Sequence, residues 1–297
     1  MRTRILSFAF VVLAAVSVNA NAGINKVPEV KDVETLADEL IDADSLELTT
    51  VNDIKDFVKK VETISAPYLV GEESLSDQEK TIKVLDAVAN YAETKAEGST
   101  LDMVEAGLLN TIIYHYKTGL NIHSLQGQTA HNLVSAVTNE AEAWQKLENT
   151  LSDYYAYLAI MHHEGGTLAQ IQASGSLWRL ADARYNDTQK LIESGLNPNG
   201  KSVFGIKDME NLSSQIVTEF TKKAKGFIED PGDFGESKYF KEAANGLNEA
   251  CANLRVDLDA WIKSRAILLS HCNNAPEALG QACILLTKIK KLGELEQ

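Results

Sequence analysis

The side chains best suited to chemistry in this sequence are three neighbours, His162, His163 and Glu164. Imidazole and carboxylate groups bind metal ions, and a metalloprotease helix carries two histidines four residues apart with a glutamate between them. Adjacent histidines instead point about 100° apart around a helix, so that motif is not present. A polar helix end, where a positive side chain complements the helix dipole, is the favoured interpretation, and a weak metal site is the alternative. We therefore predict no metal ligands.

A second combination is the thiol of Cys272 beside the imidazole of His271. Adjacent side chains seldom face each other, and a disulfide would consume the thiol, so we do not expect a catalytic pair. The chain contains no Gly-x-Ser-x-Gly elbow, no phosphate-binding glycine loop and no dinucleotide fingerprint. Carboxylates such as Asp257 and Asp259 are typical of solvated helix faces. We predict a protein that is not an enzyme and that uses no cofactor.

The N-terminus has the layout of a cleavable secretory signal over residues 1–22. Arg2 and Arg4 precede an apolar run over 5–16, and Ala20 and Ala22 provide the small residues before a cleavage site. The apolar run is shorter than the ~20 residues that span a bilayer. Since no cysteine follows Ala22 directly, a lipoprotein cleavage site is not expected. We predict a periplasmic or secreted protein that does not insert into a membrane.

The formal charge of the chain is −14 at pH 7. Removing Arg2 and Arg4 with the signal would move it to −16, because each arginine carries one positive charge. Such a protein repels nucleic acid and anionic lipid, and at low salt it attracts a strongly cationic protein. Solubility alone also explains an acidic surface, and without further information it is the favoured interpretation. Neither interpretation predicts the oligomeric state.

The three cysteines, Cys251, Cys272 and Cys283, all lie in the last fifth of the chain. An exported protein meets oxidising conditions, and these residues lack the close spacing of a zinc site. An odd number leaves one thiol over or allows an intermolecular bond. We expect one local disulfide.

The periodicity of apolar residues predicts an all-α fold of successive antiparallel helical hairpins that form an elongated bundle. No alternating segment of strand length competes with this interpretation. Ser76 and Glu79 form a capping box for one helix, and Gly119 is expected to end the next. The expected helices cover residues 33–43, 51–64, 77–96, 100–119, 128–163, 167–194, 207–228, 237–271 and 276 to the C-terminus.

The chain is organised around the hairpin that turns at Glu164-Gly165-Gly166. The two glycines permit the backbone to end the first helix, and the Thr167 side chain is expected to cap the second. The first helix presents an apolar stripe that must pack against a partner: Leu147, Leu151, Tyr154, Leu158 and Met161. The three tryptophans, Trp144, Trp178 and Trp261, all fall among apolar positions, so core packing is favoured over a ligand site for each.

A short repeat links two of the predicted turns. Residues 97–101 read Glu-Gly-Ser-Thr-Leu, and residues 164–168 read Glu-Gly-Gly-Thr-Leu, at a separation of 67 residues. Duplication of a hairpin would explain the match. Convergence would explain it equally well, because glycine followed by threonine is a common way to stop and restart a helix.

Turn-forming residues over 197–200 mark the clearest boundary inside the chain. We accordingly predict a signal peptide over 1–22, an N-terminal helical region over 23–125, a central helical hairpin over 126–196 and a C-terminal helical domain over 205–297.

The last predicted hairpin resembles the LprI-type lysozyme inhibitor domain, a small helical module of the bacterial envelope. That family has Ala-Trp-x-x-x-Arg with a nearby cysteine, then a turn and Cys-Leu-x-x-x-Thr-x-x-Arg. Trp261, Arg265, Cys283 and Thr287 match this pattern, and Lys290 stands where the family has arginine. The sequence departs from the family at Ser264, where an aromatic residue is common, and in the spacing of Cys272 from Arg265.

The resemblance implies a structural role for these motif residues. Trp261 would anchor the hairpin, a Cys272–Cys283 disulfide would close its turn, and Cys251 would be the free thiol. The central hairpin resembles a degenerate copy: at an offset of 107, Tyr154 aligns with Trp261 and Ser176 with Cys283, while Arg184 aligns with Lys291.

The family further implies an exported, non-catalytic binding protein that inhibits a cationic lysozyme (muramidase). A structural or interaction module of the cell envelope without inhibitory activity is the alternative.

Overall fold

The computed structural model describes residues 33–43, 51–68, 76–127, 131–200, 205–237 and 239–294. These residues are 89% helical, with nine α-helices and no strands among them, so the all-α prediction is confirmed. The predicted signal peptide, the segment up to Asp32 and the start of the long helix at Gln128 lie outside the described residues. The α-helices are α2 (Val33–Ala43), α3 (Val51–Ser65), α4 (Asp77–Ala96), α5 (Thr100–Gly127), α6 (His131–His163), α7 (Gly166–Ser194), α8 (Lys207–Glu229), α9 (Phe240–Leu269) and α10 (Ala275–Gly293). Two short 3₁₀ helices, η1 (Ala66–Tyr68) and η2 (Gly232–Glu236), follow α3 and α8.

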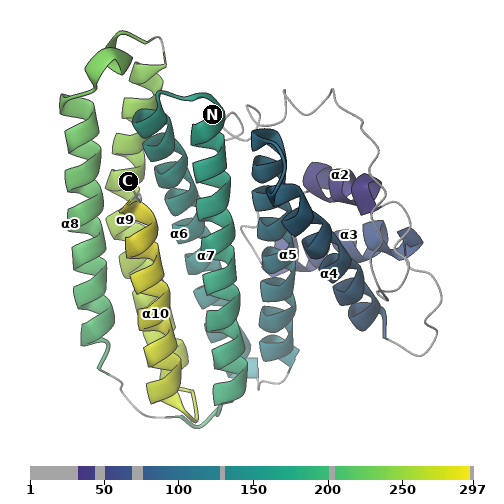
Figure 1. The fold of residues 1–297 in the computed structure, drawn as a ribbon. Helices are drawn as coiled ribbons and strands as arrows, with labels where there is room; N and C mark the ends of the chain where they lie inside the picture. The colour runs from purple at the N-terminus through teal and green to yellow at the C-terminus, as the bar shows by residue number, and fades with distance from the viewer. Residues whose placement is uncertain are drawn as a thin grey trace.

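Five of the helices close into a ring in the order α6, α7, α10, α8, α9 (Figure 1). The most extensive contact in this ring joins α6 to α9, although about eighty residues separate them in the chain. By contrast, α9 and α10 are joined by a short turn but contact each other little, because α8 packs against both. The predicted C-terminal hairpin is therefore two helices whose main partners lie elsewhere. The central and C-terminal helices share one hydrophobic core.

The interior of the ring is filled by the predicted stripe of α6. Leu147, Leu151, Tyr154 and Leu158 are fully buried. The ring of Tyr154 stacks on Phe220 of α8, with ring centroids 4.2 Å apart. Its hydroxyl donates a hydrogen bond to the Phe220 carbonyl at 3.2 Å. Because this polar atom is satisfied, the tyrosine can be buried without an unpaired donor.

Two of the three tryptophans occupy the core as predicted, and the third does not. Trp144 and Trp261 are buried and meet edge to face, with centroids 5.5 Å apart. Trp178 is only half-buried and is not part of the core cluster, so its predicted core role is wrong. The buried positions around it are Ser176 and Leu180. Residues two positions away from a buried position lie on the opposite side of a helix, which turns Trp178 outward.

A second group of helices packs on the outside of the ring (Figure 1). Here α5 lies along α7, α4 runs antiparallel along α5, and α2 and α3 complete the group.

The predicted capping box of α4 is confirmed: the Glu79 N–H donates to Ser76 Oγ at 3.3 Å, and the Ser76 N–H donates to Glu79 Oε2 at 2.9 Å. The predicted end of α5 at Gly119 is wrong, because α5 continues to Gly127. Beyond Gly119, Asn121 is buried and donates to Thr188 Oγ1 of α7 at 2.9 Å. Such tertiary contacts outweigh the ~1 kcal/mol that a glycine costs inside a helix.

The turn between α6 and α7 uses left-handed backbone, as its glycines predict. Glu164, Gly165 and Gly166 have φ angles of 55°, 83° and 77°. The predicted cap is wrong, because Gly165 is the N-cap residue of α7 and no side chain caps this end. Since α7 already begins at Gly166, Thr167 stands inside the first helical turn, two positions after the N-cap residue.

The repeat found in the sequence corresponds to a parallel, in-register pair of helices. A Cβ atom added at Gly107 of α5 would lie 2.9 Å from Ser174 Cβ of α7, and these residues are 67 positions apart. Asn121 and Thr188, which share a hydrogen bond, are also 67 positions apart. The two repeated turns therefore begin two neighbouring helices at the same end of the molecule. Duplication and convergence are both compatible with this arrangement.

Candidate functional site

Ionisable side chains converge most closely in the core, between α6, α7 and α9. Four residues form this group, which we call the buried charge cluster: Glu140, Arg184, Asp187 and Arg265. Each is between 0% and 2% exposed. Charged residues are almost never fully buried unless they are paired, so their partners decide what this group can do.

Glu140 is the central acceptor of the cluster. Its Oε2 accepts from Arg184 Nη2 at 2.6 Å, and its Oε1 accepts from Arg184 Nη1 at 2.9 Å, which makes a two-pronged ion pair. Oε1 also accepts from Arg265 Nη1 at 3.2 Å and from the indole Nε1 of Trp261 at 2.8 Å. One carboxylate thus joins two helices to its own.

Asp187 supplies the second negative charge. It accepts from Arg184 Nη1 at 2.7 Å and pairs with Arg265 Nη2 through its other oxygen. The Arg184 guanidinium also lies over the ring of Trp144, 4.7 Å from its centroid. The charges of the two arginines and the two carboxylates therefore cancel. The indoles of Trp144 and Trp261 contact Arg184 and Glu140, respectively.

The electrostatics keep the cluster ionised. Burial by itself raises the pKa of Glu140, but Arg184 and Arg265 outweigh this and hold the pKa at about 2. For Arg184, burial lowers the pKa, and the charges of Glu140 and Asp187 raise it well above its usual value. Neither group can exchange a proton near neutral pH, and water does not reach them. The cluster is therefore better explained as an ion-pair network that holds three helices together than as a site of acid–base chemistry.

The residues of the family resemblance divide between this cluster and the surface. Arg265 belongs to the cluster, and the indole of Trp261 donates to its Glu140. Thr287 lies on α10 and donates to the Cys283 carbonyl within its own helix at 2.8 Å. Lys290 also lies on α10 and pairs with Glu219 of α8 at 3.0 Å. These four residues of the motif do not form one site.

Sequence reasoning missed Glu140 and Asp187, the acidic half of the cluster. A signal was available in the helical spacing. Asp187 continues the line of Leu180 and Arg184, three or four residues apart on the buried face of α7. A charged residue on a buried helix face needs a buried partner of opposite charge. Arg184 and Arg265 could therefore have been predicted to pair with buried carboxylates.

The predicted Cys272–Cys283 disulfide is not present, because all three cysteines are free thiols. The two side chains belong to different surroundings. Cys272 lies beside the end of α7, where its backbone forms a bridge with Leu196 and its thiol donates to the Leu268 carbonyl. Cys283 instead faces α8. Burial raises the pKa of Cys272 and of Cys251 to about 11, so neither thiol is activated as a nucleophile.

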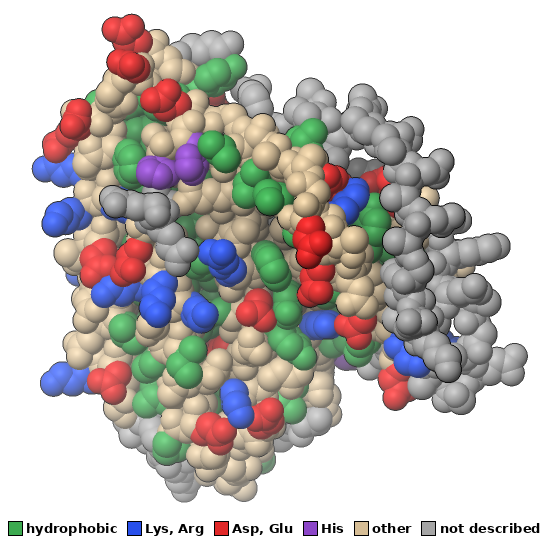
Figure 2. Space-filling view, viewed as in Figure 1, with side chains coloured by type: hydrophobic (Ala, Val, Ile, Leu, Met, Phe, Trp, Pro, Cys, Tyr) green, Lys and Arg blue, Asp and Glu red, His purple; other side chains and the backbone are tan. Residues whose placement is uncertain are grey.

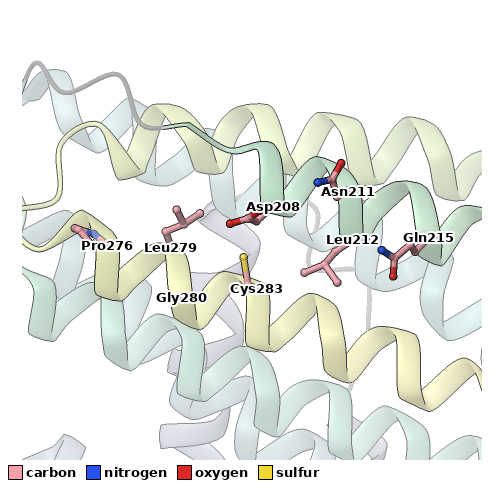
Figure 3. Close-up of a pocket in the computed structure, with 8 residues that line it drawn as sticks. All are labelled: Asp208, Asn211, Leu212, Gln215, Pro276, Leu279, Gly280 and Cys283. Atoms are coloured by element: carbon pink, nitrogen blue, oxygen red, sulfur yellow. The ribbon is translucent and has the colours of Figure 1, made fainter.

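An open groove runs between α8 and α10 (Figure 3). In this view the thiol of Cys283 and the carboxylate of Asp208 project toward the space between the two helices. Burial, followed by the negative charge of Asp208, raises the pKa of Cys283. No basic side chain lines the groove, which is formed by Asp208, Asn211, Leu212, Gln215, Pro276, Leu279, Gly280 and Cys283. It has no group placed to deprotonate the thiol.

The histidines at the end of α6 contact each other but do not form a metal site. The rings of His162 and His163 are 4.5 Å apart, and His162 also packs against Phe227 of α8 at 5.8 Å. Burial, then the neighbouring His163 and Lys223, lower the pKa of His162. Across the described ranges, no group of three or more potential metal ligands is found. Within the same ranges, no helix combines the length and apolar character that a bilayer crossing requires.

Comparison with known proteins adds no assignment to this arrangement. No family model, curated protein or solved structure matches the chain, so the resemblance to the LprI-type family stays a prediction that rests on the motif residues alone.

Proposed function

We propose that this chain is an exported, non-catalytic binding protein whose partner is a cationic protein. The observation that carries the proposal is the distribution of charge. The buried charge cluster contains two acidic and two basic side chains and cancels itself. The excess of 42 acidic over 28 basic residues therefore lies outside the cluster, where it can attract positive charge.

The specific form of the proposal is inhibition of a lysozyme. The motif around Trp261 and Arg265 supports it, together with the signal-like residues 1–22, which favour the periplasm or the cell exterior. Long-range attraction would speed the encounter with a cationic muramidase, and a surface of the helical bundle would then cover the substrate cleft. No nucleic acid, cofactor or metal takes part in this proposal.

The test is a titration of lysozyme activity with the purified protein at low and at physiological salt. We expect inhibition that saturates near one equivalent at low salt and weakens as salt rises. Cytochrome c, which is cationic but has no muramidase activity, serves as a competitor that separates specific inhibition from simple charge attraction. Full activity at a tenfold excess of the protein in low salt would remove the inhibitor proposal.

The alternative function is an interaction module of the cell envelope without inhibitory activity. The parallel packing of α5 on α7, which places two similar turns at one end of the molecule, favours it. This alternative predicts a partner that is recovered by affinity capture and stays bound at high salt, while lysozyme activity is unaffected.

A further inference from the structure

The two repeated turns form one exposed surface, which we call the paired-turn surface. It comprises residues 97–103, at the start of α5, and residues 164–168, at the start of α7. Because α5 and α7 run parallel and in register, both turns lie at the same end of the molecule (Figure 1). Leu101 and Leu168 occupy equivalent places in the two turns, since they too are 67 positions apart.

This surface exposes apolar side chains from both helices. Leu101 is 43% exposed, Met103 is 41% exposed and Leu168 is 60% exposed. Figure 2 shows several separate hydrophobic side chains at the surface near the upper ends of the helices. Two equivalent leucines on adjacent helices make a shared patch, and such patches on a protein surface mark interaction sites more often than scattered single residues do.

The charges around these apolar residues are all of one sign. The charged residues of the two turns are Glu97, Asp102 and Glu164, and Glu97 and Glu164 are exposed. The Ser99 hydroxyl and N–H both donate to Asp102, at 2.6 and 2.7 Å, which lowers the pKa of this carboxyl and keeps it charged. The nearest preceding cation, Lys95, is held 2.6 Å from the buried Glu105. Lys95 also helps to lower the pKa of Asp102, but its single positive charge is paired with the carboxylate of Glu105, so the rim stays negative overall.

We propose that the paired-turn surface docks a cationic amphipathic segment of the partner protein, an inference that rests on the proposed function. Apolar residues of that segment contact Leu101, Met103 and Leu168, while flanking Lys or Arg side chains pair with the acidic rim. A second copy of the chain fits the surface poorly, because each copy would bring the same three carboxylates to the contact. Anionic lipid is repelled for the same reason.

The experiment compares two double variants with the wild-type chain. In the test variant, Leu101→Asn and Leu168→Asn remove the shared apolar contact. In the control variant, Val256→Asn and Ile284→Asn remove side chains of similar exposure, 66% and 53%, from α9 and α10. The probe is a fluorescent helical peptide of lysine and leucine, and a lysine–serine peptide of equal charge reports attraction by charge alone. Fluorescence anisotropy gives the affinity, and light scattering gives the oligomeric state.

We expect the lysine–leucine peptide to bind the wild-type and control proteins alike, and to bind the test variant about tenfold more weakly. The lysine–serine peptide should bind all three proteins weakly and equally. Equal binding of the lysine–leucine peptide to the test and control variants would overturn the location of the site but leave the proposed function standing. No binding of this peptide to the wild-type protein would overturn the docking of such a segment, whereas the lysozyme titration judges the function separately. Concentration-dependent dimers that disappear in the test variant would overturn the proposal in favour of a second copy.

Discussion

The substitution Glu140→Gln gives the most direct test of the buried charge cluster. The amide has nearly the same shape as the carboxylate, so the core is not emptied. It removes the one negative charge that Arg184, Arg265 and the Trp261 indole all contact, and it places an NH₂ donor against donors. The cluster is then left with an uncompensated positive charge in the core, which is strongly unfavourable.

The size of the effect follows from the pKa of Glu140. This pKa falls from 4.5 to about 2 in the folded protein. Each pKa unit corresponds to about 1.36 kcal/mol, so the ionised carboxylate contributes about 3 kcal/mol at neutral pH. This value agrees with the cost of breaking a buried ion pair by removing one partner, which is about 3 to 5 kcal/mol. Because the folded-state pKa is the lower one, this contribution is complete above pH 4.5 and is lost as the pH falls toward 2.

The assay is urea unfolding followed by far-ultraviolet circular dichroism and tryptophan fluorescence at pH 7 and at pH 3. We expect a loss of about 3 kcal/mol in the free energy of unfolding at pH 7 and a smaller loss at pH 3. Glu142→Gln is the matched control, because Glu142 is half-buried on the same helix but outside the cluster. A loss below about 0.5 kcal/mol for Glu140→Gln, or equal losses for both variants, would refute the reasoning.

Three further predictions address packing, capping and the thiols. Gly107→Ala should lower the free energy of unfolding by about 1 to 3 kcal/mol, because the new methyl group meets Ser174 across the contact of α5 with α7. Gly175→Ala on α7 meets nothing within 4 Å and should instead raise it by about 0.5 to 1 kcal/mol; equal urea midpoints for the two variants would contradict this account. Ser76→Ala removes the capping box of α4 and should cost about 1 kcal/mol in the same assay, while an unchanged midpoint would show that the cap is not needed. Cys272, with its pKa raised from 9.0 to about 11, should react with iodoacetamide at pH 8 about a hundredfold more slowly than an exposed thiol, as read by mass spectrometry. An intact mass two hydrogens lower than that of the reduced chain would instead reveal a disulfide.

Features encoded by neighbouring residues could be predicted from the sequence. The capping box of Ser76 and Glu79 fixes the start of α4 within four residues of chain, and α2 likewise has the predicted bounds. The continuation of α5 past Gly119 could not be predicted in this way, because the hydrogen bond of Asn121 to Thr188 depends on a helix 67 residues later. Local signals place helix ends correctly where no tertiary contact overrides them.

The candidate site shows the same limit. The family resemblance predicted structural roles for Trp261 and Arg265, and both lie in the core. Their partner Glu140 lies on α6, and only the topology that packs α6 against α9 reveals the contact. The disulfide prediction was wrong for a related reason: a short turn suggested that Cys272 and Cys283 meet, whereas α9 and α10 pack on other helices and the two thiols have different neighbours.

The closed order of the five helices has a consequence for synthesis. When α6 leaves the ribosome, the surfaces that will cover its apolar stripe belong mainly to α9 and in part to α8, neither of which has yet been translated. The apolar residues of α6 therefore stay exposed on the nascent chain while α7 and α8 are translated. Exposed apolar surface of this kind is what chaperones bind. This exposure ends only when α9 packs against α6, a step that also brings Arg265 to Glu140.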